Sequence, residues 1–198
     1  MDDSNSVVEA AAGCREVCFV RRLRRFLGYM ASRLFLLTVI SALLIISFYL
    51  AMNTANIWVL IDDGLSARAA VVLMNEDSSD LPKYFRQEFL SQDPVLQVGL
   101  SDNSPYQDYE IRGFDHRVKM VSVWSWPWEN VARAEIIESI PAIDGTIRSS
   151  RREAALLSGG EARLSPPKWA TSRYRVTLTR TAGRWMISNL QLIEQIEE

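Results

Sequence analysis

One long apolar segment dominates the hydrophobic pattern of the chain. No Lys, Arg, Asp, Glu or His occurs from Leu34 to Ile61, and the densest stretch reads LFLLTVISALLIISFYLAM. A bilayer core of about 30 Å needs about 20 apolar residues in a helix, and a soluble core helix is rarely apolar on every face for so long. The segment also exceeds the roughly 7–15 apolar residues of a cleaved signal peptide. The pattern therefore predicts an uncleaved transmembrane signal-anchor helix over residues 34–61.

Helical periodicity continues beyond this segment and then breaks. Apolar residues recur at helical spacing at Leu65, Ala69, Val72 and Leu73. The first helix can therefore run on directly from the span, which would couple the following domain rigidly to the bilayer. The turn residues NEDSSD end it, and Ser79 or Asp80 is expected to cap a second, short helix with Pro82 near its start. Its apolar stripe is Leu81, Tyr84, Phe85, Phe89 and Leu90.

The rest of the chain has residue patterns that are typical of β-strands. The segments YEIRGFD, HRVKMVSVWSW and VARAEIIESIPAI are rich in β-branched and aromatic residues. In SRYRVTLTRTAGRWMISNLQLIE, apolar and polar residues alternate on both sides of a Gly-containing turn, which predicts a hairpin. A long excursion before it, TIRSSRREAALLSGGEARLS, predicts a short helix capped by Ser150 and ended by Gly159 or Gly160. Helices followed by an antiparallel sheet indicate the α+β class.

The distribution of basic residues predicts the orientation of the span. Six arginines precede it: Arg15, Arg21, Arg22, Arg24, Arg25 and Arg33. Two aspartates, Asp62 and Asp63, follow it directly, so the positive-inside rule places the N-terminus in the cytoplasm. The expected organisation is a cytoplasmic tail (1–33), the transmembrane helix (34–61) and an extracytoplasmic domain (62–198) in the cell membrane. Tyr49 and Trp58 suit the outer interface, where aromatic rings anchor helices.

Charge and cysteine content exclude some classes of function. The net charge of the whole chain is −2, and a mildly acidic outer domain is not expected to bind nucleic acid. Cys14 and Cys18 are the only cysteines and lie in the predicted cytoplasmic tail, so no disulfide is expected to hold the outer domain. Ordinary reduced thiols are the expected state of both, and acylation beside the basic juxtamembrane stretch is the alternative.

The order of elements carries a resemblance to a known superfamily. The closing hairpin YRVTLTRTAGRWMISNLQL and the helical opening ARAAVVLMNEDSSDLPKYFRQEFL resemble the nuclear-transport-factor-2-like (NTF2-like, cystatin-like or SnoaL-like) superfamily. The resemblance covers about Asp62 to Glu194. It implies a curved sheet that wraps a helical pair into a cone with an interior pocket. With one N-terminal span, the chain is similar to bitopic assembly subunits of type IV secretion systems and Gram-positive conjugation machines.

Three tryptophans alternate in VWSWPWENV: Trp124, Trp126 and Trp128. If the strand continues through them, all three rings project to one face, although Pro127 cannot donate to a sheet ladder and indicates an end, a bulge or an edge. An aromatic platform or pocket lining for a glycan or a partner is one interpretation. Core filling between a curved sheet and its helices is favoured for Trp124 and Trp126. For Trp128 both interpretations, core and exposed platform, stay open.

The sequence offers a sparse set of catalytic groups. His116 is the only histidine, and Asp115 beside it would point to the opposite face of a strand unless a bulge intervenes. A pocket acid or base could in principle come from Asp115, His116, Glu135 or Glu138. There is no G-x-S-x-G elbow, and one His without Cys predicts no metal site in the outer domain. We expect His116 to be an ordinary surface or strand-end residue, and the alternative is a place in the cone pocket. We do not expect the protein to be an enzyme.

The basic excursion is the remaining candidate for binding. Its cations are Arg148, Arg151, Arg152, Arg163 and Lys168. Charge in a long loop usually means only solvation, yet binding is a common reason for an insertion of this length. Together with Trp128, these residues form a hypothetical surface for an acidic partner or an anionic wall polymer.

Taken together, these features predict a non-catalytic, membrane-anchored scaffold or accessory subunit of an envelope-spanning assembly of the secretion, conjugation or sporulation type. The alternative is a membrane-tethered binding module for a small apolar ligand or glycan, with a SnoaL-like enzyme third. In that module Trp124, Trp126 and His116 would line the pocket. The expected partners are the membrane and other envelope proteins, self-association is left open, and no cofactor is expected.

Overall fold

The computed structural model describes residues 3–101, 103–159 and 163–196. It divides into two units, Met1–Tyr49 and Leu50–Glu198, which we call the first unit and the globular unit. A single helix, α1 (Asp3–Met74), contributes to both. The predicted continuation of the first helix beyond the apolar segment is confirmed.

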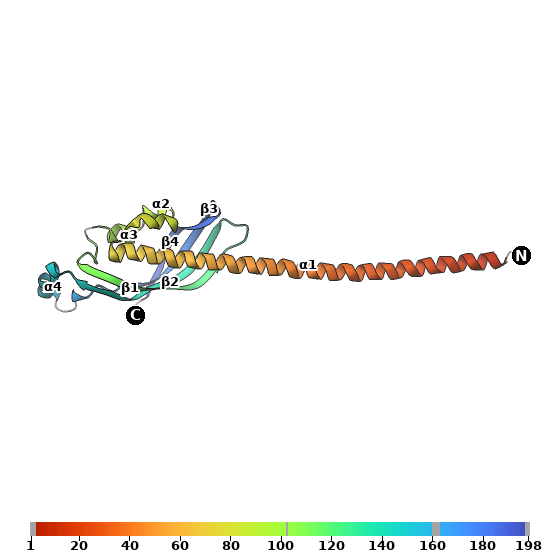
Figure 1. The fold of residues 1–198 in the computed structure, drawn as a ribbon, viewed down its shortest axis with the longest axis horizontal. Helices are drawn as coiled ribbons and strands as arrows, with labels where there is room; N and C mark the ends of the chain where they lie inside the picture. The colour runs from red at the N-terminus through yellow and green to blue at the C-terminus, as the bar shows by residue number, and fades with distance from the viewer. Residues whose placement is uncertain (1–2, 102, 160–162, 197–198) are drawn as a thin grey trace. The chain divides into compact units, whose positions relative to one another are not determined.

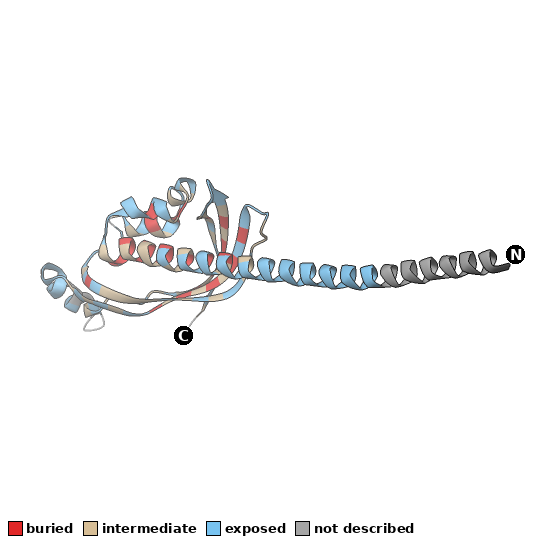
Figure 2. Cartoon of the chain, turned by 45° about the vertical axis from the view of Figure 1, so that its right-hand side comes forward, coloured by how far each residue is buried: buried red, intermediate tan, exposed pale blue. Residues whose placement is uncertain are grey.

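In the first unit, side chains from Phe26 to Phe48 are exposed on every face of α1 (Figure 2). The described residues contain one helix, Phe26–Met74, that is long and apolar enough to cross a membrane. The hydroxyl of Thr38 donates to the carbonyl oxygen of Leu34 at 2.9 Å. That bond satisfies its polar group within the helix, as an apolar environment requires.

The α+β prediction is confirmed in the globular unit. Its elements after α1 are η1 (Ser78–Lys83), α2 (Gln87–Leu90), α3 (Pro94–Gly99), β1 (Tyr109–Trp124), β2 (Val131–Ile147), η2 (Ser149–Arg151), α4 (Arg152–Gly159), β3 (Thr171–Thr181) and β4 (Arg184–Ile196). The strands form one curved antiparallel sheet in the order β1-β2-β3-β4 (Figure 1). Each strand therefore lies beside its neighbour in sequence, and the connections are short except between β2 and β3, where η2 and α4 intervene.

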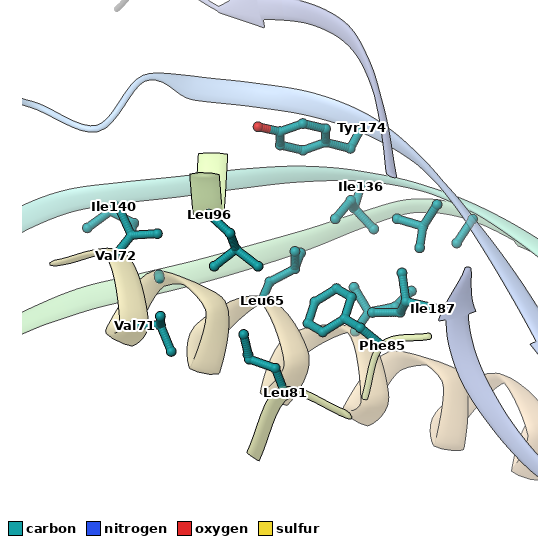
Figure 3. Close-up of a cluster of buried hydrophobic side chains, with 14 of the residues drawn as sticks. Leu65, Val71, Val72, Leu81, Phe85, Leu96, Ile136, Ile140, Tyr174 and Ile187 are labelled. Carbon is teal, nitrogen blue, oxygen red and sulfur yellow. The ribbon is translucent and has the colours of Figure 1, made fainter. Parts of the chain in front are cut away.

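The core forms where one face of α1 meets the inner face of the sheet. Ile57, Ile61, Leu65 and Ala69 recur every four residues on α1 and are fully buried. The inner face of the sheet contributes Ala132, Ala134, Ile136, Ile140, Tyr174, Val176, Leu178 and Ile187. Figure 3 shows Leu65 and Phe85 lying together with Ile136 and Ile187.

The globular unit and the predicted outer domain have different bounds. The globular unit begins at Leu50, not at Asp62, because Asn53, Ile57 and Ile61 are buried within it. Sequence patterning could not separate these residues from the apolar run, since a helix face that packs on a sheet is as apolar as one that faces lipid. The remaining apolar stretch, Leu34–Met52, is about 28 Å long at about 1.5 Å per residue, close to the thickness of a bilayer core.

The predicted second helix over Leu81–Leu90 is wrong as one element. Asp77, not Ser79 or Asp80, caps η1 by accepting from the Ser79 amide at 3.1 Å. The chain then becomes extended at Phe85, which bridges Ile187 on β4, and it re-enters a helix only at Gln87. The Arg86 amide donates to the carbonyl of Ile187 at 2.9 Å, so sheet pairing outcompetes local helix propensity here.

The strand predictions hold with one difference. The segments around Gly113 and His116 form one strand, β1, whose register shifts at Ile111/Gly113, Asp115/Arg117 and Met120/Ser122. The closing hairpin is confirmed as β3 and β4, with Ala182 and Gly183 both at positive φ, as a tight hairpin turn requires.

The short helix of the excursion is confirmed as α4. Ser150 lies inside the preceding turn η2 rather than at the helix cap. Gly160, one of the two predicted helix ends, lies outside the described residues.

The central packing predicts a large effect at Phe85. Its ring is fully buried and stacks on Phe89 with 5.5 Å between centroids. We expect Phe85→Ala to lower the free energy of unfolding by about 3–5 kcal/mol, because the cavity cannot collapse fully. Leu157→Ala is the control, since Leu157 is 90% exposed and its loss should cost less than about 0.5 kcal/mol. Chemical unfolding of the full chain in detergent, followed by circular dichroism, measures both, and equal midpoints would contradict this account of the core.

Candidate functional site

The globular unit has two ends with different chemistry. At the first, which we call the Asn53 end, the β1–β2 loop meets the β3–β4 turn, because the Arg180 amide donates to the carbonyl of Asn130 at 2.8 Å. At the other, the Met74 end, α1 terminates beside the start of β1 and the end of β2. The positive φ of Asn75 ends α1 there. Along α1 the two ends are about 32 Å apart at about 1.5 Å per residue.

The tryptophans lie at the Asn53 end, and core filling is wrong for Trp124. Trp124 and Trp128 are 61% and 74% exposed, while Trp126 between them is half-buried. The rings of Trp124 and Trp126 meet edge to face at 5.4 Å, and those of Trp126 and Trp128 stack at 5.1 Å. The register shift at Met120/Ser122 reverses the alternation of β1, so Val123 pairs with the buried Ala134 and Trp124 pairs with the exposed Arg133 on the outer face. Trp126 and Trp128 follow the end of the strand.

His116 is not the surface residue that we expected. It lies at the bulge between Asp115 and Arg117, where the break in strand alternation lets its side chain turn inward. Only 6% of that side chain is exposed, and Nε2 lies 3.2 Å from Oε1 of the fully buried Glu138. Asp62 of α1 lies 4.0 Å from Nδ1.

The other acidic candidates do not join this pair. Asp115 forms an exposed ion pair with Arg117 at 2.5 Å. Glu135 faces the outer side of the sheet, where Arg173 and Arg175 donate to it at 3.0 and 3.1 Å. Their hydrogen bonds lower the pKa of Glu135, that of Arg175 most. Of the four candidates for acid–base chemistry, the fold therefore brings together only His116 and Glu138.

A buried ion pair that the sequence analysis missed ties α3 to α1. Arg68 of α1 donates to Asp93 through Nε at 2.5 Å and through Nη2 at 2.9 Å, and both side chains are almost completely buried. Burial acts to lower the pKa of Arg68, but the hydrogen bonds and the charge of Asp93 outweigh it and raise that pKa. Asp93 also caps α3 by accepting from the Val95 amide at 3.0 Å.

These pairs form one polar cluster inside an apolar core. Burial, followed by the nearby charge of Glu138, raises the pKa of Tyr174, so its hydroxyl stays protonated at neutral pH. Among the described residues, Nη1 of Arg68 and Oε2 of Glu138 are buried without a hydrogen-bond partner. Such groups are costly, and the charges they belong to are stabilised chiefly by their partners in the cluster.

The Met74 end carries an open apolar groove. A cavity of about 370 Å³ is bordered by Val95 and Val98 of α3, by Tyr106 and by Trp169, with Tyr174 and Ser172 also reaching it. The rings of Tyr106 and Trp169 stack at 6.2 Å. His116, Glu138, Arg68 and Asp93 do not border this cavity. The groove therefore offers mainly apolar surface with two tyrosines, Tyr106 and Tyr174, and no acid–base pair.

One of the predicted cations, Arg148, borders a second cavity that shares Val72, Gly99 and Tyr106 with this groove. Arg151 lies 3.3 Å from Asp108, and the Arg148 amide donates to the carbonyl of the same residue at 2.9 Å. The carbonyl of Arg163 accepts from the hydroxyl of Tyr109 at 3.0 Å. Arg152 and Lys168 are exposed. The basic excursion thus lies against the loop before β1 and borders the Met74 end, whereas Trp128 lies at the Asn53 end and does not share its surface.

Among the described residues, no group of three or more His, Cys, Asp or Glu could hold a metal ion. The sequence did contain a signal for the missed ion pair. Arg68 interrupts the apolar face of a helix, and Asp93 followed by Pro94 is a strong helix start. Pairing the two, however, required the path of the chain between them.

The ion pair gives a matched test of burial. We expect Asp93→Asn to lower the free energy of unfolding by about 3–5 kcal/mol, because it leaves the Arg68 charge buried without its counter-charge. The control is Asp80→Asn, since the pair of Asp80 with Lys83 is exposed and should contribute less than about 1 kcal/mol. Thermal unfolding of the full chain in detergent compares them, and similar shifts for both variants would show that burial does not govern the Arg68 pair.

Comparison with known proteins gives little. No protein-family model matches the chain, and no curated protein does. One solved structure, the Kfla4162 protein from Kribbella flavida, matches with 12% identity and a TM-score of 0.41, over 73% of this chain and 95% of that one.

Proposed function

We propose that this chain is a single-pass membrane protein whose globular unit is a non-catalytic, partner-binding subunit of an envelope-spanning assembly. In this proposal Leu34–Met52 spans the bilayer, the arginine-rich N-terminus is cytoplasmic, and the globular unit is extracytoplasmic. The resemblance to the NTF2-like superfamily and its bitopic secretion and conjugation subunits belongs to the same proposal.

The observation that carries the proposal is the apolar groove at the Met74 end. Val98 is half exposed on one wall, and the stacked pair of Tyr106 and Trp169 forms another. An exposed apolar depression with cations beside it suits a protein surface that offers an apolar side chain and acidic neighbours. The buried ionisable groups, in contrast, are engaged with one another in the core.

A second function is favoured by the size of the groove. Its volume of about 370 Å³ falls within the range of small-molecule sites, roughly 300–1,000 Å³. A tethered module for a small apolar ligand would therefore use the same walls, with Tyr174 as the polar contact. A SnoaL-like enzyme is less favoured, because His116 and Glu138 do not border the groove.

The partner proposal is tested by a charge placed in the groove. Mild detergent extraction of the natively expressed protein should yield a large, reproducible complex with other envelope proteins. Val98→Asp should reduce recovery of those proteins by about tenfold or more, because a charge would be buried at the contact. Val121→Asp makes the same change at an exposed site on β1 and should leave recovery unchanged. A lone monomer or dimer from wild-type protein would overturn the assembly role.

The basic excursion gives an independent arm of that experiment. Arg151→Glu with Arg152→Glu should weaken the same complex, and the loss should be smaller at high salt, where exposed charges are screened. Recovery equal to that of the wild type at low salt would remove these cations from the contact surface.

The orientation is tested through the two native cysteines. Cys14 and Cys18 lie in the predicted cytoplasmic tail, so an impermeant maleimide should not label intact cells. Replacing both by serine and introducing Asn103→Cys, an exposed position of the globular unit, should produce labelling without lysis. The reverse pattern would show that the globular unit is cytoplasmic.

A further inference from the structure

An exposed aromatic cluster at the Asn53 end has no role in the proposed partner groove. Trp124 and Trp128 leave most of their surface in water, and Val131, which borders a cavity together with Trp124, is 40% exposed. Large apolar side chains that gather at one exposed place on a protein surface mark a contact site for a partner or a membrane. Tryptophan in particular suits an environment that is apolar on one side and wet on the other.

The structure holds this cluster in a defined position. The Asn53 amide nitrogen donates to the hydroxyl of Ser125, within the loop that carries the rings. The Asn53 side-chain oxygen accepts from the indole nitrogen of Trp185 on β4 at 2.8 Å. A turn closes the loop itself, with the Glu129 amide donating to the carbonyl of Trp126 at 3.2 Å. One buried asparagine therefore fixes both hairpins to α1.

The position of that asparagine indicates what the cluster contacts. Asn53 follows directly on Met52, the last residue of the apolar stretch proposed to span the bilayer. The loop is thus bound to α1 at the level where the helix changes from apolar to mixed composition. In membrane proteins this level is the interface, where Trp and Tyr are enriched.

Basic side chains lie at the same end of the globular unit. Arg133 pairs with Trp124 across the β1–β2 ladder and is exposed, and Arg184 is exposed at the start of β4. Arg180 lies against the ring of Trp185 with 5.8 Å to its centroid. Arginine beside tryptophan suits a lipid surface, because the rings enter the headgroup region while the cations remain near phosphate groups. A single acidic side chain among the described residues of the loop, Glu129, accompanies them.

We infer that Trp124 and Trp128 insert into the interfacial region of the lipid bilayer, with Trp126 stacked between them and Arg133 and Arg184 at the level of the lipid phosphates. This inference rests on the proposed membrane anchorage. The globular unit then has a second attachment to the bilayer besides α1, which restricts its tilt. A glycan or protein partner for the same rings is the outcome that the experiment below separates from a lipid surface.

The test uses the intrinsic fluorescence of the full chain in vesicles. Trp58 is changed to Phe in every sample, because its ring lies on α1 close to the proposed interface. The protein is reconstituted in phosphatidylcholine and phosphatidylglycerol, with and without bromine on the acyl chains. Bromine quenches only rings that reach the bilayer, so we expect clear quenching of the Trp58→Phe protein. Adding Trp124→Phe and Trp128→Phe should remove most of that quenching.

The matched control is Trp169→Phe in the same background, which removes a ring of the Met74 groove. The amount of fluorescence lost to the brominated lipid should then be unchanged. Because Trp124 and Trp128 are exposed, their replacement should not change the melting temperature. Quenching that is absent, or unaffected by the loss of both rings, would overturn the inference and leave the cluster to a soluble partner. Flotation of the chain with vesicles is recorded in parallel. A chain that does not float refutes the anchor, whereas one that floats without quenching refutes only the contact of the tryptophans with lipid.

Discussion

The packing of one face of α1 on the inner face of the sheet is the interaction on which the globular unit depends. Ile57, Ile61 and Leu65 are each completely buried, and burial of such a side chain contributes about 1.5–3 kcal/mol. The short segments between α1 and β1 have too few residues to form a core alone, so they are stabilised by docking on this helix. Gly64 shows how closely they approach, because a Cβ there would lie 3.0 Å from the Cβ of Tyr84.

The polar cluster within this core is a constraint rather than a gain in stability. Removing charges from water is costly, and a buried pair often contributes no more than apolar residues of the same volume. The Arg68–Asp93 pair has instead a geometric consequence: its two hydrogen bonds fix α3 against one turn of α1. Since Val95 and Val98 of α3 form a wall of the groove, that ion pair positions the surface proposed for the partner.

The sequence predicted the fold class and the closing hairpin because both follow from local patterns, namely alternation and turn chemistry. It did not separate the part of the apolar segment that packs on the sheet, because Ile57 is equally apolar whether lipid or a sheet covers it. It misassigned the segment around Phe85, where a single bridge to Ile187 overrides helical spacing. His116 was misjudged because a β-bulge turned it inward, and Trp124 because the register shift at Met120/Ser122 turned it outward. Each failure involves a contact between residues far apart in the chain.

The two ends of the globular unit divide its surface chemistry in a way that follows from α1. Asn53, at one end of the packed helix segment, gathers the tryptophan loop and Trp185, and Met74, at the other, borders a cavity beside the groove. The tryptophan loop and the groove are therefore both attached to the same rigid part of α1. A rotation of this helix segment at one end also rotates its other end. If lipid fixes the tryptophans, it also fixes the direction in which the groove faces. A partner then meets an oriented surface, which lowers the rotational freedom lost on binding.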